Sequence, residues 1–174
     1  MKQESNTNEL LSPHFRLPEF TESPTARKHG IPNIPPAEAV DNLRALCHGT
    51  LEPLRMALGL PVIITSGFRT KALNDLLAHH SDRSQHMQGR ASDLYVGWNG
   101  PEEDKPSRRE LLIRAFRLII TSEQIDFDQL ILYPTFIHVS YVSRERNRRT
   151  ILLARKDGKL GYGKLSVANA LKVQ

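Results

Sequence analysis

Apolar residues between positions 36 and 58 recur at steps of three and four, the spacing of one face of an α-helix. This face consists of Val40, Leu43, Cys47, Leu51, Leu54 and Leu58. Pro36 suits the first turn of such a helix, and Gly59 suits its end. Pro53 lies inside the pattern, where a proline removes a backbone donor and kinks or interrupts a helix. The pattern therefore predicts one long helix with a break near Pro53.

Shorter apolar runs follow, and they alternate with two further helical patterns. β-Branched and aromatic runs that turn residues bound are typical of strands. We expect strands over 62–65, 93–98, 127–133 and 136–142, with one more that begins at Thr150, and helices over 71–80 and 108–120. The 127–133 and 136–142 strands flank Pro134 and Thr135, which indicates a tight hairpin. The sum predicts an α+β fold with helices packed on a mostly antiparallel sheet.

The domain organisation follows from length and polarity. A chain of 174 residues fits one domain with a single core. Residues 1–14 are mostly polar and are predicted to form a flexible N-terminal tail. Residues 15–174 are predicted to form the single domain, which opens with a proline-rich segment docked through its apolar residues.

Composition limits the compartment and the class of protein. Apolar residues at 39% and charged residues at 25% are ordinary for a soluble globular protein. The single cysteine, Cys47, cannot form an internal disulfide and is expected to be buried. No segment approaches the ~20 apolar residues of a membrane span. Because no signal peptide is seen, we expect a protein that is cytoplasmic as synthesised, with release to the cell wall by a phage-type route as the accompanying hypothesis.

The positive charge of the chain is concentrated near its end. The net charge is +5, and six basic residues against one acid lie between positions 144 and 156. Such a run is usually a solvated surface, and the alternative is a binding patch for a polyanion. No aromatic residues interleave with it, as a single-strand nucleic-acid platform would require, so nucleic acid is a disfavoured partner.

Three residues raise the possibility of a metal site. His86 lies on a loop seven positions before Asp93, and Gly89 between them permits a sharp backbone path. Asp93 is expected at the first residue of its strand, and His138 lies in the middle of another. Two histidines and one carboxylate leave a fourth tetrahedral position open, as in catalytic zinc sites. The alternatives are that His138 is a hydrogen-bonded core residue and that Ser84, His86 and Asp93 tie down a loop.

The stretch from Ser84 to Asp93 matches the pattern S-x-H-x-x-G-x-A-x-D. In this it resembles the zinc D-Ala-D-Ala carboxypeptidase and dipeptidase family, whose fold the hedgehog signalling domain shares. The likeness extends over roughly residues 15–142, and these blocks resemble a subgroup found in phage endolysins and bacterial cell-wall enzymes.

This resemblance implies roles for individual residues. It implies that His86, Asp93 and His138 bind zinc, and that Arg69 reaches toward the carboxylate of a substrate, a task that suits a planar guanidinium. The alternative is that Arg69 is a surface turn residue with no contact to a substrate. The resemblance also implies that Ser84 lies beside the site as a substrate contact, with Gln85 and Ser140 as weaker candidates for the same task.

The motif does not specify the general base, the residue that would accept a proton from the zinc-bound water. Many members of the family place an acid three or about six residues before the last histidine, where this chain has Thr135 and Leu132. Asp128, or with less support Asp126, is the candidate general base, and the alternative for Asp128 is a structural hydrogen bond at the start of its strand.

A second route needs no acid. Tyr133 or Tyr141 would donate a hydrogen bond to the oxyanion, while His79 or His80 handles the proton. Adjacent histidines at a helix end more often satisfy the terminal carbonyls instead.

Three hypotheses of function follow. The first is a zinc-dependent peptidase that hydrolyses peptidoglycan stem peptides, of the D-Ala-D-Ala carboxypeptidase or endolysin type. The second is a zinc-stabilised, catalytically weak or inactive module that binds cell-wall peptides. The third is a basic nucleic-acid-binding protein, which only the basic run over 144–156 supports.

Overall fold

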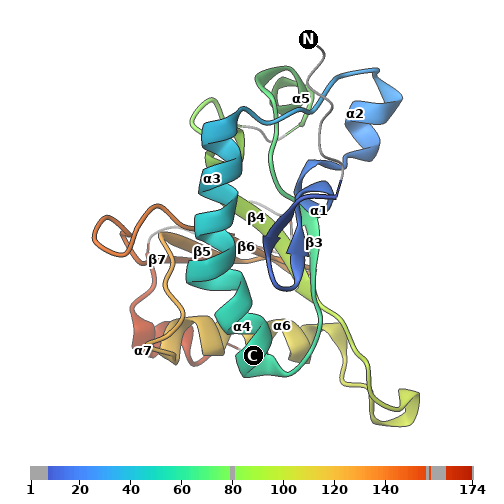
Figure 1. The fold of residues 1–174 in the computed structure, drawn as a ribbon. Helices are drawn as coiled ribbons and strands as arrows, with labels where there is room; N and C mark the ends of the chain where they lie inside the picture. Colours follow the sequence, from blue (N-terminus) through green and yellow to red (C-terminus); the bar gives the residue numbers. More distant parts are fainter. Residues whose placement is uncertain (1–7, 79–80, 156, 158–163, 174) are drawn as a thin grey trace.

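The computed structural model describes residues 8–78, 81–155, 157 and 164–173, and Figure 1 shows their arrangement. Its centre is a five-stranded sheet in the order β3-β4-β6-β5-β7. The strands are β3 (Val62–Ser66), β4 (Ala91–Val96), β5 (Gln129–Leu132), β6 (Ile137–Ser140) and β7 (Thr150–Leu153). Neighbours from β3 to β5 in this order pair antiparallel, whereas β7 pairs parallel to β5. The mixed α+β fold with a mostly antiparallel sheet is confirmed.

The long apolar pattern forms two helices joined by a π-helical turn. These are α3 (Ala37–Leu46), the turn η1 (Cys47–Leu51) and α4 (Glu52–Leu58), which ends at Gly59 in the left-handed conformation. Figure 1 shows α3 and α4 as one nearly continuous column. The predicted interruption near Pro53 is confirmed, because a proline ring displaces the carbonyl one turn earlier and the helix widens there. Cys47 is buried as expected, and burial raises the pKa of its thiol to about 12.

The remaining helices are mostly short. They are α1 (Leu17–Thr21), α2 (Pro24–Lys28), α5 (Lys71–Asp75), η2 (Gln85–Gln88), η3 (Glu102–Asp104), α6 (Arg108–Thr121) and α7 (Val167–Ala170). Helix α6 starts with a capping box between Ser107 and Glu110 and packs its apolar face on β4 and β5. The helix predicted over 71–80 ends at Asp75, and the last two residues of that range lie outside the described part of the chain. No described helix is long and apolar enough to cross a bilayer.

The N-terminal residues that the structure describes are not a tail. Leu10–Ser12 form strand β1, which pairs with β2 (Phe15–Arg16) in a small hairpin. Leu11 is 2% exposed and belongs to the same core cluster as the long helix. The predicted tail of residues 1–14 is therefore wrong from residue 10 onward, because burial of Leu11 stabilises the docked hairpin. Residues 1–7 lie outside the described part.

Candidate metal centre

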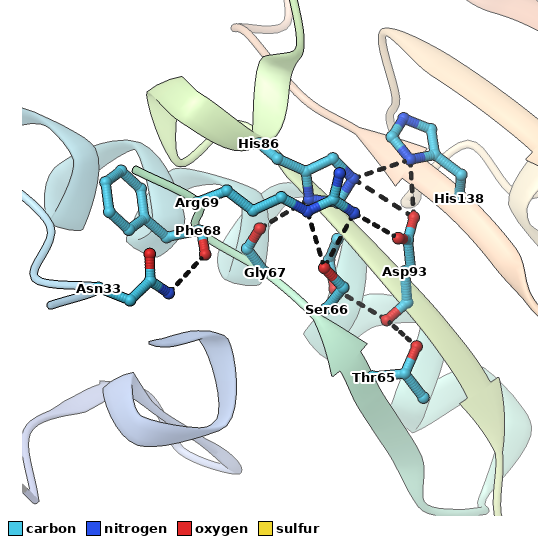
Figure 2. A network of polar contacts seen from close by, with 10 residues as sticks. Asn33, Thr65, Ser66, Gly67, Phe68, Arg69, His86, Asp93 and His138 are labelled. Atoms are coloured by element: carbon cyan, nitrogen blue, oxygen red, sulfur yellow. Dashed lines mark hydrogen bonds and ion pairs between the residues drawn. The ribbon is translucent and has the colours of Figure 1, made fainter. Parts of the chain in front are cut away.

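Two of the predicted ligands face each other across neighbouring strands. Asp93 on β4 pairs in register with His138 on β6, so both side chains leave the sheet on the same face. The sequence pattern predicted Asp93 as the first residue of its strand. Strand β4 begins at Ala91, so Asp93 is instead its third residue. Because β3 and β6 pair with β4 on either side, Asp93 is held from both edges. Figure 2 shows His86 approaching this pair from η2.

The three side chains converge on one point. His138 Nδ1 lies 2.8 Å from Asp93 Oδ1, His86 Nε2 lies 3.4 Å from the same oxygen, and the two nitrogens are 3.2 Å apart. A tetrahedral zinc ion with bonds of about 2.0–2.1 Å sets its ligand atoms about 3.3 Å apart. The triangle of donor atoms therefore has close to the size that such an ion requires.

The three donor atoms of this triangle also have too few protons to satisfy one another by hydrogen bonds, which favours a bound cation. The Gly67 carbonyl accepts from His86 Nδ1 at 2.6 Å, which places the ring proton on that nitrogen. Burial lowers the pKa of His86, so the ring is neutral and Nε2 presents a lone pair. This lone pair faces Asp93 and His138, and the triangle holds at most one proton, on His138 Nδ1, between the lone pairs of His86 Nε2 and Asp93 Oδ1. The donor set therefore fits a metal ion better than it fits a hydrogen-bonded core histidine.

Asp93 is held as a carboxylate. Burial opposes its ionisation, but its contacts with His86 and His138 outweigh burial and lower the pKa of Asp93. Its second oxygen, Oδ2, accepts from Arg69 Nη2 at 3.0 Å. Oδ1 is thereby left to face the two histidines.

Arg69 thus has a task that the sequence analysis did not foresee. Its Nε and Nη2 both donate to Ser66 Oγ, and Nη2 also donates to Asp93. The guanidinium therefore fixes the metal-facing carboxylate, as Figure 2 shows. Arg69 also lines the cleft, and its Nη1 makes no hydrogen bond to another described residue, so the predicted substrate contact stays a prediction.

The loop that carries Arg69 is itself clamped. Asn33 donates to the Phe68 carbonyl at 2.9 Å and accepts from the Thr70 backbone at 2.9 Å. A Cβ on Gly67 would lie 2.6 Å from backbone atoms of Phe20, so only glycine allows this close approach. Sequence reasoning missed Asn33 and Gly67, because their partners are distant in the chain and neither residue type is a ligand.

The loop before β4 follows its predicted path. Gly89 ends η2 with a φ of 68°, the left-handed conformation that favours glycine, and this turn leads the chain back to Asp93. Ser84 lies at the N-terminal end of η2 and lines the cleft beside the cluster, as does Gln85. Ser140 instead accepts from the Gln129 backbone within the sheet, where it is fully buried.

A cleft of about 970 Å³ opens onto the cluster. Tyr133 and Phe136, whose rings stack at 4.3 Å, form part of its wall at the β5–β6 hairpin. The basic residues Arg69, Arg83, Arg146 and Arg148 also line it. Among described lining residues the acids are Asp93 and Asp128, so the cleft carries a net positive charge.

Structural contacts engage both carboxylate oxygens of Asp128. It forms an ion pair with Arg148, and it also accepts from the Arg148 backbone and from Gln85 Nε2, both at 2.9 Å. Although burial opposes it, these contacts lower the pKa of Asp128. This is the structural alternative weighed for Asp128, and a general base requires the opposite shift. Asp126, likewise buried, pairs with Arg149 and accepts from Asn147 away from the cleft.

The Asp128 contacts give a pH-dependent prediction. A carboxylate with a depressed pKa stabilises the fold above its unfolded pKa of about 3.9, and this stability is lost as the pH falls through the folded value. We expect Asp128→Asn to lower the free energy of unfolding at pH 7 by about 1–3 kcal/mol, because a buried acceptor is replaced by an amide. Urea unfolding between pH 7 and 3 should show this gap shrinking below pH 4. A constant gap over that range would contradict the assignment.

The basic run near the end of the chain is partly neutralised. Arg148 and Arg149 pair with Asp128 and Asp126, and Arg144 donates to the Glu123 carbonyl. This pairing favours the structural interpretation of the run over a nucleic-acid surface. Lys156 lies outside the described residues.

The remaining candidates for proton transfer differ in position. Tyr133 lines the cleft, whereas Tyr141 does not and lies with its ring against Gly49. Burial, together with the charge of Asp93, raises the pKa of Tyr133, so its phenol keeps its proton at neutral pH. His79 and His80 lie outside the described residues.

Fold and site define a class of protein. A cluster of two histidines and one carboxylate that opens onto a cleft is the arrangement of mononuclear metallohydrolases. The family model for Peptidase M15 matches residues 13–111, more than half of the chain, and the protein belongs to this family of metallopeptidases. The matched region includes Arg69, His86 and Asp93 and ends before His138. A search of curated proteins found no match.

Proposed function

We propose that this protein is a zinc-dependent peptidase that hydrolyses peptidoglycan stem peptides, of the D-Ala-D-Ala carboxypeptidase or endolysin type. The observation that carries the proposal is the convergence of His86, Asp93 and His138 at the floor of a cleft. Membership of the Peptidase M15 family supports the peptidase chemistry. The substrate class rests on the motif resemblance and on the positive charge of the cleft, which attracts peptides with free carboxylates.

The residues of the chain divide the work. His86, Asp93 and His138 would hold the zinc ion, and Arg69 keeps Asp93 turned toward it. Zinc, when bound, polarises a peptide carbonyl and lowers the pKa of water. The remaining Nη1 of Arg69 is available to the carboxylate of a substrate.

Tyr133 is the proposed oxyanion donor. It lines the cleft and keeps its phenolic proton, so it offers a hydrogen bond to an oxygen on which negative charge develops. Among the described lining residues, Asp128 is the carboxylate outside the metal cluster, and its oxygens are occupied by Arg148 and Gln85. We therefore assign it to the structure of the cleft wall and not to proton transfer.

That same observation favours a second candidate function. A site with no unoccupied carboxylate lining the described part of the cleft suits a zinc-stabilised module that binds cell-wall peptides with little or no turnover. The two functions share the ligands and the cleft, so they differ in turnover alone.

Cleavage of defined stem peptides separates the two. Zinc-loaded and chelator-treated protein would be incubated with purified muropeptides, and the products identified by mass spectrometry. We expect hydrolysis with zinc, none after chelation, and recovery when zinc is restored. As a check on the oxyanion role, Tyr133→Phe should keep its zinc and turn over more slowly. Binding of muropeptides with no cleavage at any zinc content would favour the second candidate.

A further inference from the structure

The cleft carries more positive charge than the metal cluster uses. Arg69 is paired with Asp93, and Arg148 is paired with Asp128. Arg83 and Arg146 line the same cleft, and neither guanidinium makes a hydrogen bond or ion pair with another described residue. Arg146 interacts electrostatically with its neighbour Glu145, which is fully exposed to solvent. Two guanidinium groups are therefore available to a ligand.

Arg146 is held on a rigid loop. Arg149 adopts a positive φ of 48°, and its guanidinium donates to Asp126 at 2.7 Å. Asn147 donates to the other Asp126 oxygen at 2.8 Å and accepts from the Val142 backbone at 2.8 Å. A strained residue persists only where its surroundings fix it. Asp126, through Asn147 and Arg149, and Asp128, through Arg148, thus fix the 143–149 loop. Arg146 lies on this loop and lines the cleft.

Arg83 approaches from a different part of the chain. It lies in the turn that precedes η2, where its backbone N–H donates to Ser81 Oγ at 3.2 Å. Gln85, two residues later, donates to Asp128, which in turn holds Arg148. This chain of contacts ties the turn and the 143–149 loop together at one cleft.

We propose that Arg83 and Arg146 form a second anion-binding subsite that takes a free carboxylate of the peptide substrate other than its C-terminal one. This inference rests on the proposed function, since it assumes a peptide in the cleft. Stem peptides joined through a side-chain carboxyl leave an α-carboxylate free, which gives them this second charge. A guanidinium binds a carboxylate through paired hydrogen bonds, and it loses them when the carboxylate becomes an amide.

The test uses two synthetic stem peptides that differ at one group. One carries the second carboxylate and the other carries a carboxamide there. Binding by calorimetry and hydrolysis would be measured with the full-length, zinc-loaded protein. We expect the wild type to prefer the carboxylate peptide about tenfold, as one charge-assisted contact of about 1.4 kcal/mol provides. Arg146→Gln and Arg83→Gln should each reduce this preference, and together abolish it, with affinity for the amide peptide unchanged.

Arg144→Gln is the matched control. Arg144 is exposed on the same loop, contacts the Glu123 carbonyl and does not line the cleft, so this variant should keep the preference. Arg148 is left intact because its loss would strip the buried Asp128 of its partner.

The outcomes separate the two proposals. Equal binding of both peptides by the wild type, or a preference that survives in the double variant, overturns the subsite. If both peptides are cleaved at equal rates, the proposed function stands and the subsite fails. If neither is cleaved but the preference appears and disappears with Arg83 and Arg146, the subsite stands and the peptidase fails.

Discussion

In the variant His86→Ala, zinc and peptide hydrolysis should be lost together. His86 supplies one of the three donor atoms, and it is the ligand whose proton is fixed by the Gly67 carbonyl. Its removal leaves one nitrogen and one carboxylate, too few for a site with an open coordination position. Because the Lewis acid is worth several kcal/mol in the transition state, we expect kcat/KM to fall by roughly 1,000-fold or more.

The measurement combines metal content with turnover of a muropeptide. Zinc per protein after gel filtration should drop from about one to near zero, while circular dichroism shows whether the fold remains. His48→Ala is the matched control, since His48 is exposed on η1 and outside the cleft. Full hydrolysis by His86→Ala at wild-type rates would remove the metal centre from the mechanism.

The substitution Gly89→Ala should damage both the fold and the metal site. Gly89 has a φ of 68°, and a Cβ at this position would lie 2.2 Å from the Ala39 carbonyl oxygen on α3. The left-handed conformation costs a non-glycine residue about 1–2 kcal/mol. Forcing a methyl group against packed backbone adds about 1–3 kcal/mol, so we expect a total loss of about 2–5 kcal/mol. The strain is relieved by moving the loop that carries His86, which should also weaken zinc binding.

A matched glycine separates the two terms. Gly30 has a φ of 62° but has no atom within 4 Å of the position where a Cβ would stand. Gly30→Ala should therefore cost about 1–2 kcal/mol, the conformational term alone, and should leave zinc affinity unchanged. Urea unfolding gives the stability of both variants, and a competition assay with a chromogenic chelator gives their zinc affinity. If the two variants were equally stable, contact with Ala39 would not be what demands glycine at position 89.

The elements near the site were predictable where a local pattern specifies them. The β5–β6 hairpin around Pro134 and the interruption at Pro53 follow from proline chemistry, which acts within a few residues. The start of β4 was placed two residues late, because Ala91 and Ser92 have no strong strand preference of their own. They are buried by pairing with β6, which is a contact between distant segments. The β1 strand was missed for the same reason.

The sequence by itself determined the fold class, the donor types and the turn that brings His86 back toward Asp93, since periodicity, ligand chemistry and a left-handed glycine are local properties. Only the tertiary structure decided how these groups are used. In it, Arg69 donates a hydrogen bond to Asp93, and the Gly67 carbonyl accepts one from His86. Asp128 forms an ion pair with Arg148 and accepts a hydrogen bond from Gln85. Each of these contacts joins segments that only the packing of the sheet and loops brings within hydrogen-bond distance, so no spacing along the chain encodes them.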